Sequence, residues 1–396
     1  MEVKVIKFDH LGNGISKIGE KVVFIKRALP NEIVDIVINK DNKKYQFATI
    51  KSIIKKSEKR IDSLCPYYDK CGGCDFLHTT DDTEEQFKIN KGKELLGSNI
   101  EFYNTKTFNY RNKVVLHVKD NQVGFYKEKS NNIIDVDYCY LLDDSLNRVL
   151  DLLRSYVKNN KHNIKEVMIR TGNEIMMDVT GTVNNDFVNY FSFVDTIIIN
   201  DKVIKGKGYI DKQILDYKFK ISPKSFFQVN YCGLEEIYHI LKDNLKSDYN
   251  KALDLYSGTS VMGILISDFC KEVISVESNS SATNDALINI KNNNINNLKV
   301  INEKVENVID KLRDSDLIII DPPRSGLDKK TISYLEEIHS KNLVYISCDM
   351  ITLKRDLEAL KKYYDISKMY LVNMFPKTYH VESVCFLKCR KEDEIK

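Results

Sequence analysis

Apolar runs alternate with amphipathic segments in the C-terminal part of the chain, from about residue 250. Short runs rich in Val, Ile, Leu and Tyr are typical of buried strands and occur at 252–256, 273–277, 298–302, 317–321, 343–347, 368–375 and 381–387. Helical periodicity fills most of the intervals, as at 279–293 and 349–362. Strands that alternate with helices predict a doubly wound, mostly parallel sheet. Only a short link separates the last two strands, so we expect them to form a terminal antiparallel hairpin.

Before residue 250 the pattern differs, because short strands dominate and few helices are predicted. Residues 1–58 alternate in β-like runs separated by glycine turns, which predicts a small all-β barrel. Residues 62–205 are also mainly β, with an amphipathic helix at 143–160 that Asp143 or Asp144 would cap, and a further helix is expected around 231–245. We therefore predict a multidomain fold: an N-terminal β-barrel (1–58), a central mainly-β domain (62–205) and a C-terminal α/β doubly wound, Rossmann-like domain (206–396).

Composition and charge narrow the class of protein. At 396 residues, with 42% hydrophobic and 30% charged residues, the chain has the composition of a soluble protein with a large core. No apolar run approaches the length of a membrane span, so we expect a cytoplasmic protein without signal peptide or anchor. The net charge is +3, yet residues 1–60 hold 14 Lys and Arg against 7 Asp and Glu, a net charge of +7. A basic barrel suggests nucleic-acid binding, and nothing indicates an obligate protein partner.

Three cysteines follow the barrel in a C-x5-C-x2-C arrangement, namely Cys65, Cys71 and Cys74. Three thiolates do not complete a tetrahedral site, and the fourth candidate is Cys139, which follows a β-rich stretch. Four thiolates suit either zinc or an iron–sulfur cluster. Zinc ribbons usually pair two C-x2-C knuckles, and only one such knuckle is present here. The spacing therefore favours a [4Fe–4S] cluster.

Residues suited to ligand binding or catalysis follow several of the predicted C-terminal strands. One strand runs into the glycine turn 254–258, where the backbone can approach a ligand closely. Glu277 ends the next strand, a place where an acid commonly binds ribose hydroxyls. Later strands end in Asp321-Pro-Pro-Arg324 and in Cys348. Taken alone, Cys348 could be a buried structural thiol. Because the carboxyl ends of parallel strands meet at one edge, the set as a whole predicts an active site.

Five motifs together resemble the uracil-5 RNA methyltransferase family of class I S-adenosylmethionine-dependent enzymes: SPKSFFQVN (222–230), DLYSG (254–258), DPPRSGL (321–327), YISCD (345–349) and FPKTYHVES (375–383). The barrel resembles the RNA-binding TRAM domain, and the cysteine pattern together with the barrel resembles the 23S ribosomal RNA branch of the family. The resemblance implies Cys348 as nucleophile and Glu382 as base. As S-adenosylmethionine contacts it implies Gln228, Tyr256, Glu277 and Asp321.

Two neighbouring positions depart from the family's pattern. The family usually has Gly followed by Thr or Asn after D-L-Y-x-G-x, where this chain has Ser260 and Val261. This difference puts the binding of the methionine end of the cofactor in doubt. If the site were lost, the chain would be a non-catalytic RNA-binding iron–sulfur protein.

The chemistry of uracil explains why a thiol and a base are needed. Carbon 5 is a poor nucleophile until a thiolate adds at carbon 6 and moves charge into the ring. After methylation the proton on carbon 5 must be removed, and a carboxylate such as Glu382 suits this task. We predict an enzyme that methylates carbon 5 of uridine in 23S rRNA through a covalent cysteine–uracil adduct. A tRNA uridine-5 methyltransferase is a further alternative.

Overall fold

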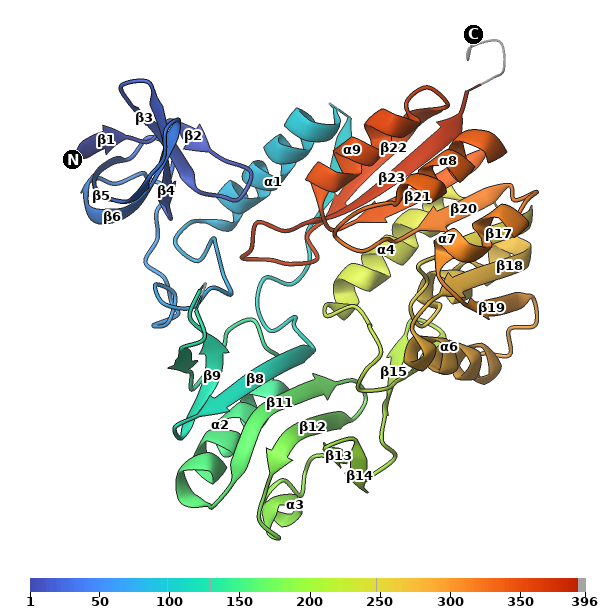
Figure 1. The fold of residues 1–396 in the computed structure, drawn as a ribbon, viewed down its shortest axis with the longest axis horizontal. Coiled ribbons are helices and arrows are strands. Elements are labelled where there is room, and N and C mark those ends of the chain that lie inside the picture. Colours follow the sequence, from blue (N-terminus) through green and yellow to red (C-terminus); the bar gives the residue numbers. More distant parts are fainter. Residues whose placement is uncertain (98, 129, 247, 391–396) are drawn as a thin grey trace.

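The computed structural model describes residues 1–97, 99–128, 130–246 and 248–390, whose strands form four sheets (Figure 1). The last six residues of the predicted domain 206–396 lie outside these ranges. A six-stranded sheet stands at the N-terminus, a seven-stranded sheet in the centre and an eight-stranded sheet at the C-terminus, with a two-stranded hairpin between the last two. The predicted fold class is confirmed. Within the described ranges, no helix combines the length and the apolar character that crossing a membrane requires.

The N-terminal sheet is a barrel with the strand order β1-β5-β6-β4-β3-β2. The strands at its two ends, β1 and β2, follow one another directly along the chain, so together they close the sheet on itself. Its core contains Val23, Ile25 and Val34, which are completely buried. The strands are β1 (Glu2–Lys4), β2 (Lys7–Phe8), β3 (Gly14–Ile18), β4 (Lys21–Lys26), β5 (Ile33–Asp41) and β6 (Tyr45–Lys55).

The central sheet has the order β10-β9-β8-β11-β12-β13-β14 and packs against helix α2 (Asp144–Asn159). As predicted, Asp143 caps this helix, because its side chain accepts a hydrogen bond from the amide of Leu146. The short helix α3 (Phe187–Tyr190) completes this layer. The strands are β8 (Lys113–Lys119), β9 (Gln122–Tyr126), β10 (Ile133–Asp135), β11 (Asn163–Thr171), β12 (Ile175–Thr182), β13 (Thr196–Ile199) and β14 (Lys202–Lys205).

The C-terminal sheet has the order β19-β18-β17-β20-β21-β23-β22-β7, and β23 runs antiparallel to both of its neighbours. The expected antiparallel hairpin of the last two strands is thus present as β22 and β23. The hairpin of β15 (Ile210–Ile214) and β16 (Tyr217–Ile221) precedes β17 in the chain. The strands of the eight-stranded sheet are β7 (Ile100–Tyr103), β17 (Tyr249–Leu255), β18 (Cys270–Glu277), β19 (Leu298–Asn302), β20 (Leu317–Ile320), β21 (Asn342–Ser347), β22 (Tyr364–Val372) and β23 (Glu382–Cys389).

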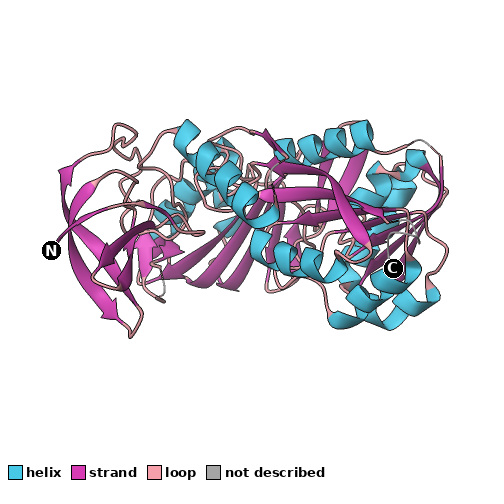
Figure 2. Cartoon of the chain, turned by 90° about the horizontal axis from the view of Figure 1, so that it is seen from above, coloured by secondary structure: helices cyan, strands magenta, loops and turns pink. Residues whose placement is uncertain are grey.

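Helices cover both faces of this sheet (Figure 2), and the side chains of its strands alternate between two apolar cores. Ile318 and Ile320 of β20 join one core, whereas Leu317 and Ile319 join the other. Two-sided burial explains why the strands appear in the sequence as continuous apolar runs. The helices are α1 (Asp81–Leu96), α4 (Tyr231–Asn244), α5 (Val261–Leu265), α6 (Ser280–Asn292), α7 (Val305–Val308), α8 (Lys329–Ile338) and α9 (Met350–Leu360).

The segment 81–103 contributes a strand to the C-terminal sheet and a helix to the layer that covers it. Strand β7 pairs in parallel with β22, and α1 packs against α9. In Figure 1, α1 lies between the N-terminal barrel and the C-terminal sheet. The chain therefore contributes to the C-terminal layer before it builds the central sheet.

Candidate active site and cysteine cavity

The predicted catalytic and cofactor-binding residues lie along one edge of the C-terminal sheet. The neighbouring strands β18, β17, β20 and β21 run parallel, and their carboxyl ends therefore meet at this edge. They present Glu277, Tyr256, Asp321 and Cys348 in that spatial order. Strand β23 is antiparallel and begins at the same edge, where it presents Glu382. The topology thus brings residues that are more than 100 positions apart in the sequence into one row.

Cys348 and Glu382 lie near each other at the ends of two paired strands. The ladder of β21 and β23 ends at the pair Ser347 and Ser383; Cys348 directly follows Ser347, and Glu382 directly precedes Ser383. Cys348 is half-buried, and the side chain of Glu382 is buried. Asp349 follows the thiol and caps α9 by accepting hydrogen bonds from the amides of Ile351 and Thr352. Because α9 begins directly after it, Cys348 has a fixed position at the end of the strand.

Burial favours the protonated form of both candidate catalytic groups. It raises the pKa of the Cys348 thiol to about 11, and the nearby Glu382 adds to the rise while Arg324 opposes it. Burial also raises the pKa of Glu382 well above its usual range, with Asp321 as a further cause. An acid and a thiol perturbed in this way at one edge of a sheet are typical of an active site.

A positive charge stands beside the thiol and the buried carboxylates. Arg324 lies on the turn after β20, and its Nη2 atom is 3.4 Å from Nε2 of His380. Burial lowers the pKa of His380 to about 4, and Arg324 adds to this effect, so His380 is neutral at pH 7. Arg324 is therefore the group near Cys348 that can stabilise negative charge, as expected for a donor to a developing enolate.

Three of the four predicted cofactor contacts line a narrow cavity. Gln228, Tyr256 and Asp321 surround a volume of about 40 Å³ together with the glycine turn that ends at Gly258. Small-molecule sites usually measure roughly 300–1,000 Å³. A nucleoside cofactor would therefore require the surrounding side chains to move apart.

The fourth predicted contact, Glu277, lies just outside this cavity. Its carboxylate accepts hydrogen bonds from the amides of Gly258, at 2.9 Å, and Asn279, at 2.6 Å. Glu277 thus fixes the glycine turn and keeps lone pairs for a ligand. The hydroxyl of Tyr256 lies 3.2 Å from Asp328 and Thr331 of the α8 N-terminus, so only its ring is directed to the cavity.

The donors around the narrow cavity fit S-adenosylmethionine. The hydroxyls of Ser257, Thr259 and Ser260 are buried and have no hydrogen-bond partner among the described residues. Burial raises the pKa of Asp254 to about 7, although Ser275 and Gly263 donate hydrogen bonds to it. Within the described ranges, neither Asp254 nor Asp321 forms an ion pair. Unpaired hydroxyls and buried carboxyl groups suit a ligand that has both polar groups and positive charge.

Ser260 stands where the family usually has glycine and adopts the backbone conformation that glycine favours. Its φ is 56° and its ψ is 36°, in the left-handed region. A side chain costs roughly 1–2 kcal/mol in this conformation. The turn therefore has a glycine-like conformation although a serine occupies this position.

We expect Ser260→Gly to stabilise the protein by about 1 kcal/mol, because glycine has no Cβ to strain the left-handed conformation. Thermal unfolding with and without S-adenosylmethionine measures this. Ser260→Ala is the matched control, since it removes the unpaired hydroxyl but retains Cβ. A glycine variant no more stable than the alanine variant would contradict the strain argument.

The loop between β22 and β23, residues 373–381, leads into Glu382 and is fixed from two sides. The amides of Asp75 and Phe76 donate to the carbonyl of Lys377, at 2.8 and 3.1 Å, and Asp75 Oδ2 accepts from the amide of Tyr379 at 3.1 Å. From α1, the buried Lys88 donates to Asn373 at 2.6 Å. The segment that follows Cys74 is thus hydrogen-bonded to the loop that positions the candidate base.

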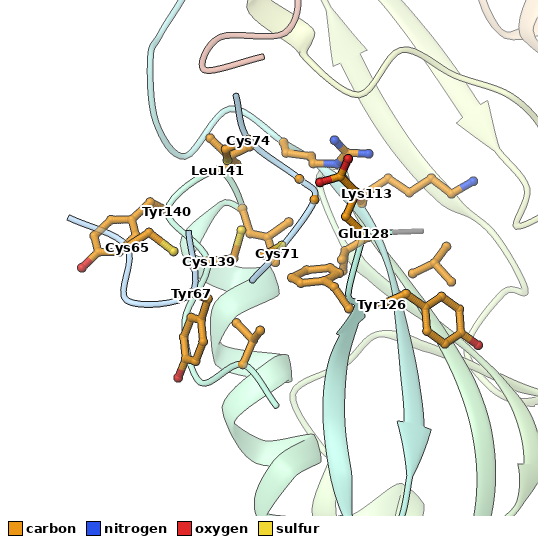
Figure 3. A pocket seen from close by; sticks show the side chains of 18 of the residues that line it. Cys65, Tyr67, Cys71, Cys74, Lys113, Tyr126, Glu128, Cys139, Tyr140 and Leu141 are labelled. Atoms are coloured by element: carbon orange, nitrogen blue, oxygen red, sulfur yellow. The ribbon is translucent and has the colours of Figure 1, made fainter. Parts of the chain in front are cut away.

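The four predicted metal ligands line one larger cavity of about 850 Å³ (Figure 3). Figure 3 places Cys65, Cys71, Cys74 and Cys139 on one side, and Lys113, Tyr126 and Glu128 on the other. Burial raises the pKa of the Cys74 thiol well above its usual range, and the three other cysteines add to the rise. Asn147 of α2 fixes Cys139 through hydrogen bonds to its amide, at 2.9 Å, and to its carbonyl, at 3.0 Å.

The arrangement of these cysteines bears on the kind of group they could hold. Among the described residues, no group of three or more His, Cys, Asp or Glu side chains is placed to hold a metal ion. One zinc ion would need all four sulfurs within about 2.3 Å of a single point. In a [4Fe–4S] cluster each thiolate binds a different iron atom, so the sulfurs stand further apart. The four thiols thus line one cavity and are not gathered around a single point.

The wall between the two cavities is the segment Phe226-Phe227-Gln228. Phe226 and Phe227 line both cavities. Phe227 is only 3% exposed and packs on Phe219, with a ring distance of 5.6 Å, so core packing is its role. Phe226 is 63% exposed, and sequence analysis did not single it out.

Lys91, which no sequence pattern indicated, lies on α1 near the active site. Its Nζ atom is 5.3 Å from the ring centre of Tyr379, and burial lowers its pKa to about 8. Asp349 is a nearby charge that opposes this shift. The sequence feature that could have indicated this helix is the acid–lysine pair of Glu84 and Lys88, which are four positions apart.

Known proteins resemble this chain over most of its length. A sequence model of the tRNA (uracil-5-)-methyltransferase family matches residues 101–390, and one of the TRAM domain matches residues 1–51. An uncharacterised RNA methyltransferase of Clostridium acetobutylicum is 33% identical, over 98% of this chain and 96% of its own length. A relative with the same description in Aquifex aeolicus is 29% identical, over 98% and 99%.

Among solved structures, the tRNA (uracil-54, C5)-methyltransferase of Pyrococcus abyssi in complex with S-adenosyl-L-homocysteine is similar over nearly the whole chain. It is 25% identical, with a TM-score of 0.82, and the match covers 98% of this chain and 100% of that one. The chain therefore belongs to the tRNA (uracil-5-)-methyltransferase family of S-adenosylmethionine-dependent RNA methyltransferases, and it contains an N-terminal TRAM domain.

Proposed function

We propose that this protein methylates carbon 5 of uridine in RNA through a covalent adduct between Cys348 and carbon 6 of the base. The observation that supports this most strongly is the position of Cys348 and Glu382 directly beside the pair Ser347–Ser383 of β21 and β23, at the sheet edge that also lines the narrow cavity. A nucleophile and a base that face one ring from neighbouring strands match the requirements of carbon-5 chemistry.

Each step of this reaction uses a group of the chain. The Cys348 thiolate bonds to carbon 6, and the electron pair of the 5,6 double bond moves toward carbon 5 and the carbonyl oxygen. Arg324 is suited to stabilise the resulting enolate. After carbon 5 has been methylated, Glu382 takes the proton from that carbon. The electron pair of this C–H bond restores the double bond, and Cys348 leaves as thiolate.

S-adenosylmethionine supplies an electrophilic methyl group. Gln228, Tyr256 and Asp321 would hold it, with Glu277 fixing the glycine turn beside the ribose. The unpaired hydroxyls of Ser257 and Thr259 are available for its polar end. The target base must leave its stack to reach Cys348, which requires unpaired or easily opened RNA.

The rate of reaction with RNA should rise with pH. Both Cys348 and Glu382 must lose a proton before they can act, and burial raises the pKa of each. Because the pKa of Cys348, about 11, lies above this range, the thiolate fraction and with it kcat/KM for RNA should increase between pH 7 and 9. Single-turnover methylation across this range measures the effect. A flat or falling profile would contradict the assignment of the two groups.

We further propose that Cys65, Cys71, Cys74 and Cys139 hold a [4Fe–4S] cluster. The methyl transfer moves no net electrons, so the cluster would serve to order the cysteine segment. That segment is hydrogen-bonded to the loop before Glu382 through Asp75.

Protein purified without oxygen should be brown and contain about four irons and four sulfides per chain. Cys139→Ser should lose most of this iron. Cys232→Ser, which alters an exposed thiol elsewhere, is the matched control and should retain it. A colourless preparation with stoichiometric zinc would exclude the cluster.

Within RNA, we propose 23S rRNA as the target, because the cysteine pattern and the basic barrel resemble the 23S branch of the family. The second candidate is tRNA, which the similar enzyme of Pyrococcus abyssi methylates. Mass mapping of 5-methyluridine in both RNAs, from cells with and without the gene, tests this. Loss from 23S rRNA alone supports the first candidate, and loss from tRNA alone replaces it with the second.

A further inference from the structure

The outer face of the N-terminal barrel has a row of side chains that crosses five strands. Strand pairing aligns Lys7 (β2) with Ile15 (β3), Ile15 with Phe24 (β4), Phe24 with Phe47 (β6) and Phe47 with Lys40 (β5). Residues that pair across strands point to the same side of a sheet. The alternate residues Val23, Ile25 and Ala48 point inward to the barrel core. Two aromatic rings therefore lie in the middle of this outer row, with a lysine at each end.

A third ring extends the aromatic centre of this face. Tyr45 precedes Phe47 by two positions on β6 and pairs with Val22, which in turn pairs with Lys17. The ring centres of Tyr45 and Phe47 are 5.6 Å apart, and those of Phe24 and Phe47 are 5.5 Å apart. Tyr45 and Phe47 are each 42% exposed. We call Phe24, Tyr45 and Phe47 the aromatic face.

Positive charge surrounds the aromatic face. Lys43 and Lys44 lie in the turn before Tyr45 and line a hollow with Lys21. Lys21 pairs with Asp41 at 2.7 Å, whereas Lys7, Lys40, Lys43 and Lys44 form no ion pair with any described residue. Exposed rings among unpaired lysines match the chemistry of a single-stranded nucleic acid, which offers stacking bases and phosphates together.

The same side of β4 leads toward the cysteine cavity. Lys26 follows Phe24 by two positions and forms an ion pair with Glu128, which lines that cavity. Lys127 and Tyr126 also line the cavity. The outer side of β4 therefore leads from the aromatic face to the rim of the cysteine cavity.

We propose that the aromatic face binds unpaired nucleotides that flank the target uridine, by stacking their bases on Phe24, Tyr45 and Phe47 while the surrounding lysines contact phosphates. This inference rests on the proposed RNA substrate, and it adds that the RNA is unpaired where it contacts the aromatic face. The stacking part of this binding should depend on unpaired bases and only weakly on salt, whereas the lysine–phosphate contacts should depend on salt.

A single tryptophan can report on stacking directly, because the natural chain contains none. In Phe47→Trp, the emission should be quenched when a short unpaired RNA binds, and the same strand in a duplex should quench it much less. Val203→Trp, at an exposed position on β14, is the matched control and should not respond. If Phe47→Trp fails to fold, Tyr45→Trp provides the same measurement. A reporter that does not respond to unpaired RNA, or responds equally to duplex, would overturn the proposal.

Affinity measurements at several salt concentrations separate stacking from charge. The double variant Tyr45→Leu, Phe47→Leu should weaken binding of unpaired RNA by about tenfold or more, with an unchanged salt slope. The double variant Lys7→Gln, Lys40→Gln should lower the slope by about 0.7 for each phosphate that a lysine no longer neutralises. Affinity for S-adenosylmethionine should stay the same in both.

These binding measurements do not depend on turnover, so they remain decisive even if the protein methylates no uridine. Unchanged RNA affinity in the leucine variant would overturn the proposal. So would a parent protein that self-associates through this face, seen in sedimentation as an oligomer that the leucine variant lacks.

Discussion

Replacing Cys348 with alanine should lower the rate of methyl transfer to RNA by at least about a thousandfold, because no other described group at this edge can add to carbon 6. S-adenosylmethionine should still bind, since Cys348 does not line the narrow cavity. Transfer of a labelled methyl group to RNA measures the first effect, and calorimetry measures the second. Cys232→Ala, at an exposed thiol, is the control and should remain active.

RNA that contains 5-fluorouridine tests the same residue without turnover. The Cys348 thiolate should add to the base and remain attached, because fluorine cannot leave carbon 5 as a proton. The wild-type protein should therefore form a complex that survives denaturation. An adduct that still forms with Cys348→Ala would show that another residue is the nucleophile.

Glu382→Gln should slow product formation by about 10²–10⁴-fold while permitting the earlier steps. Glutamine has nearly the same shape and fits the buried position, but its amide cannot take the proton from carbon 5. The methylated base should then remain bonded to Cys348, so that covalent complexes accumulate with ordinary uridine. Denaturing gels with labelled RNA measure this accumulation.

The structural role of Glu382 is the competing explanation. Glu382→Ala leaves a cavity in the sheet edge, and it should lower the melting temperature more than Glu382→Gln does. If the glutamine variant turns over at the wild-type rate, Glu382 only packs against its neighbours and another base is required.

The layout of the C-terminal sheet could be predicted because its strands are buried on both faces. Ile318, Ile319 and Ile320 all enter apolar cores, so the strand is visible in the sequence as a continuous apolar run. The same reasoning placed Cys348 and Asp321 at one edge, since parallel strands end together. The proximity of Cys348 and Glu382 depends on the antiparallel pairing of β23 with β21. The expected hairpin alone did not specify this pairing.

Helix α1 could not be predicted from hydrophobic periodicity, because its buried face is partly charged. Glu84 and Lys88 are buried and pair at 2.6 Å, so the helix has no continuous apolar stripe. Its neighbour β7 is a short edge strand, and among the described strands it pairs with β22 alone, which is distant in sequence. Both elements depend on tertiary contacts with the C-terminal sheet, and for the same reason Lys91 was missed near the active site.

Two further features required the folded chain. The left-handed conformation of Ser260 depends on the turn around it, since serine itself disfavours this conformation. The aromatic face depends on the parallel pairing of β4 with β6, which brings Phe24 beside Phe47 across 23 residues of sequence. In both cases the sequence shows no distinctive pattern, and the role of the residues depends on the neighbours that folding places beside them.

The most direct test of carbon-5 methylation uses RNA with tritium at carbon 5 of uridine and S-adenosylmethionine with a labelled methyl group. We expect one tritium to be released into water for each methyl group transferred, and nucleoside mass spectrometry should identify the product as 5-methyluridine. Cys348→Ala should give neither signal. Methylated RNA that retains its tritium would mean that the methyl group is placed on another atom, and it would contradict the proposed reaction.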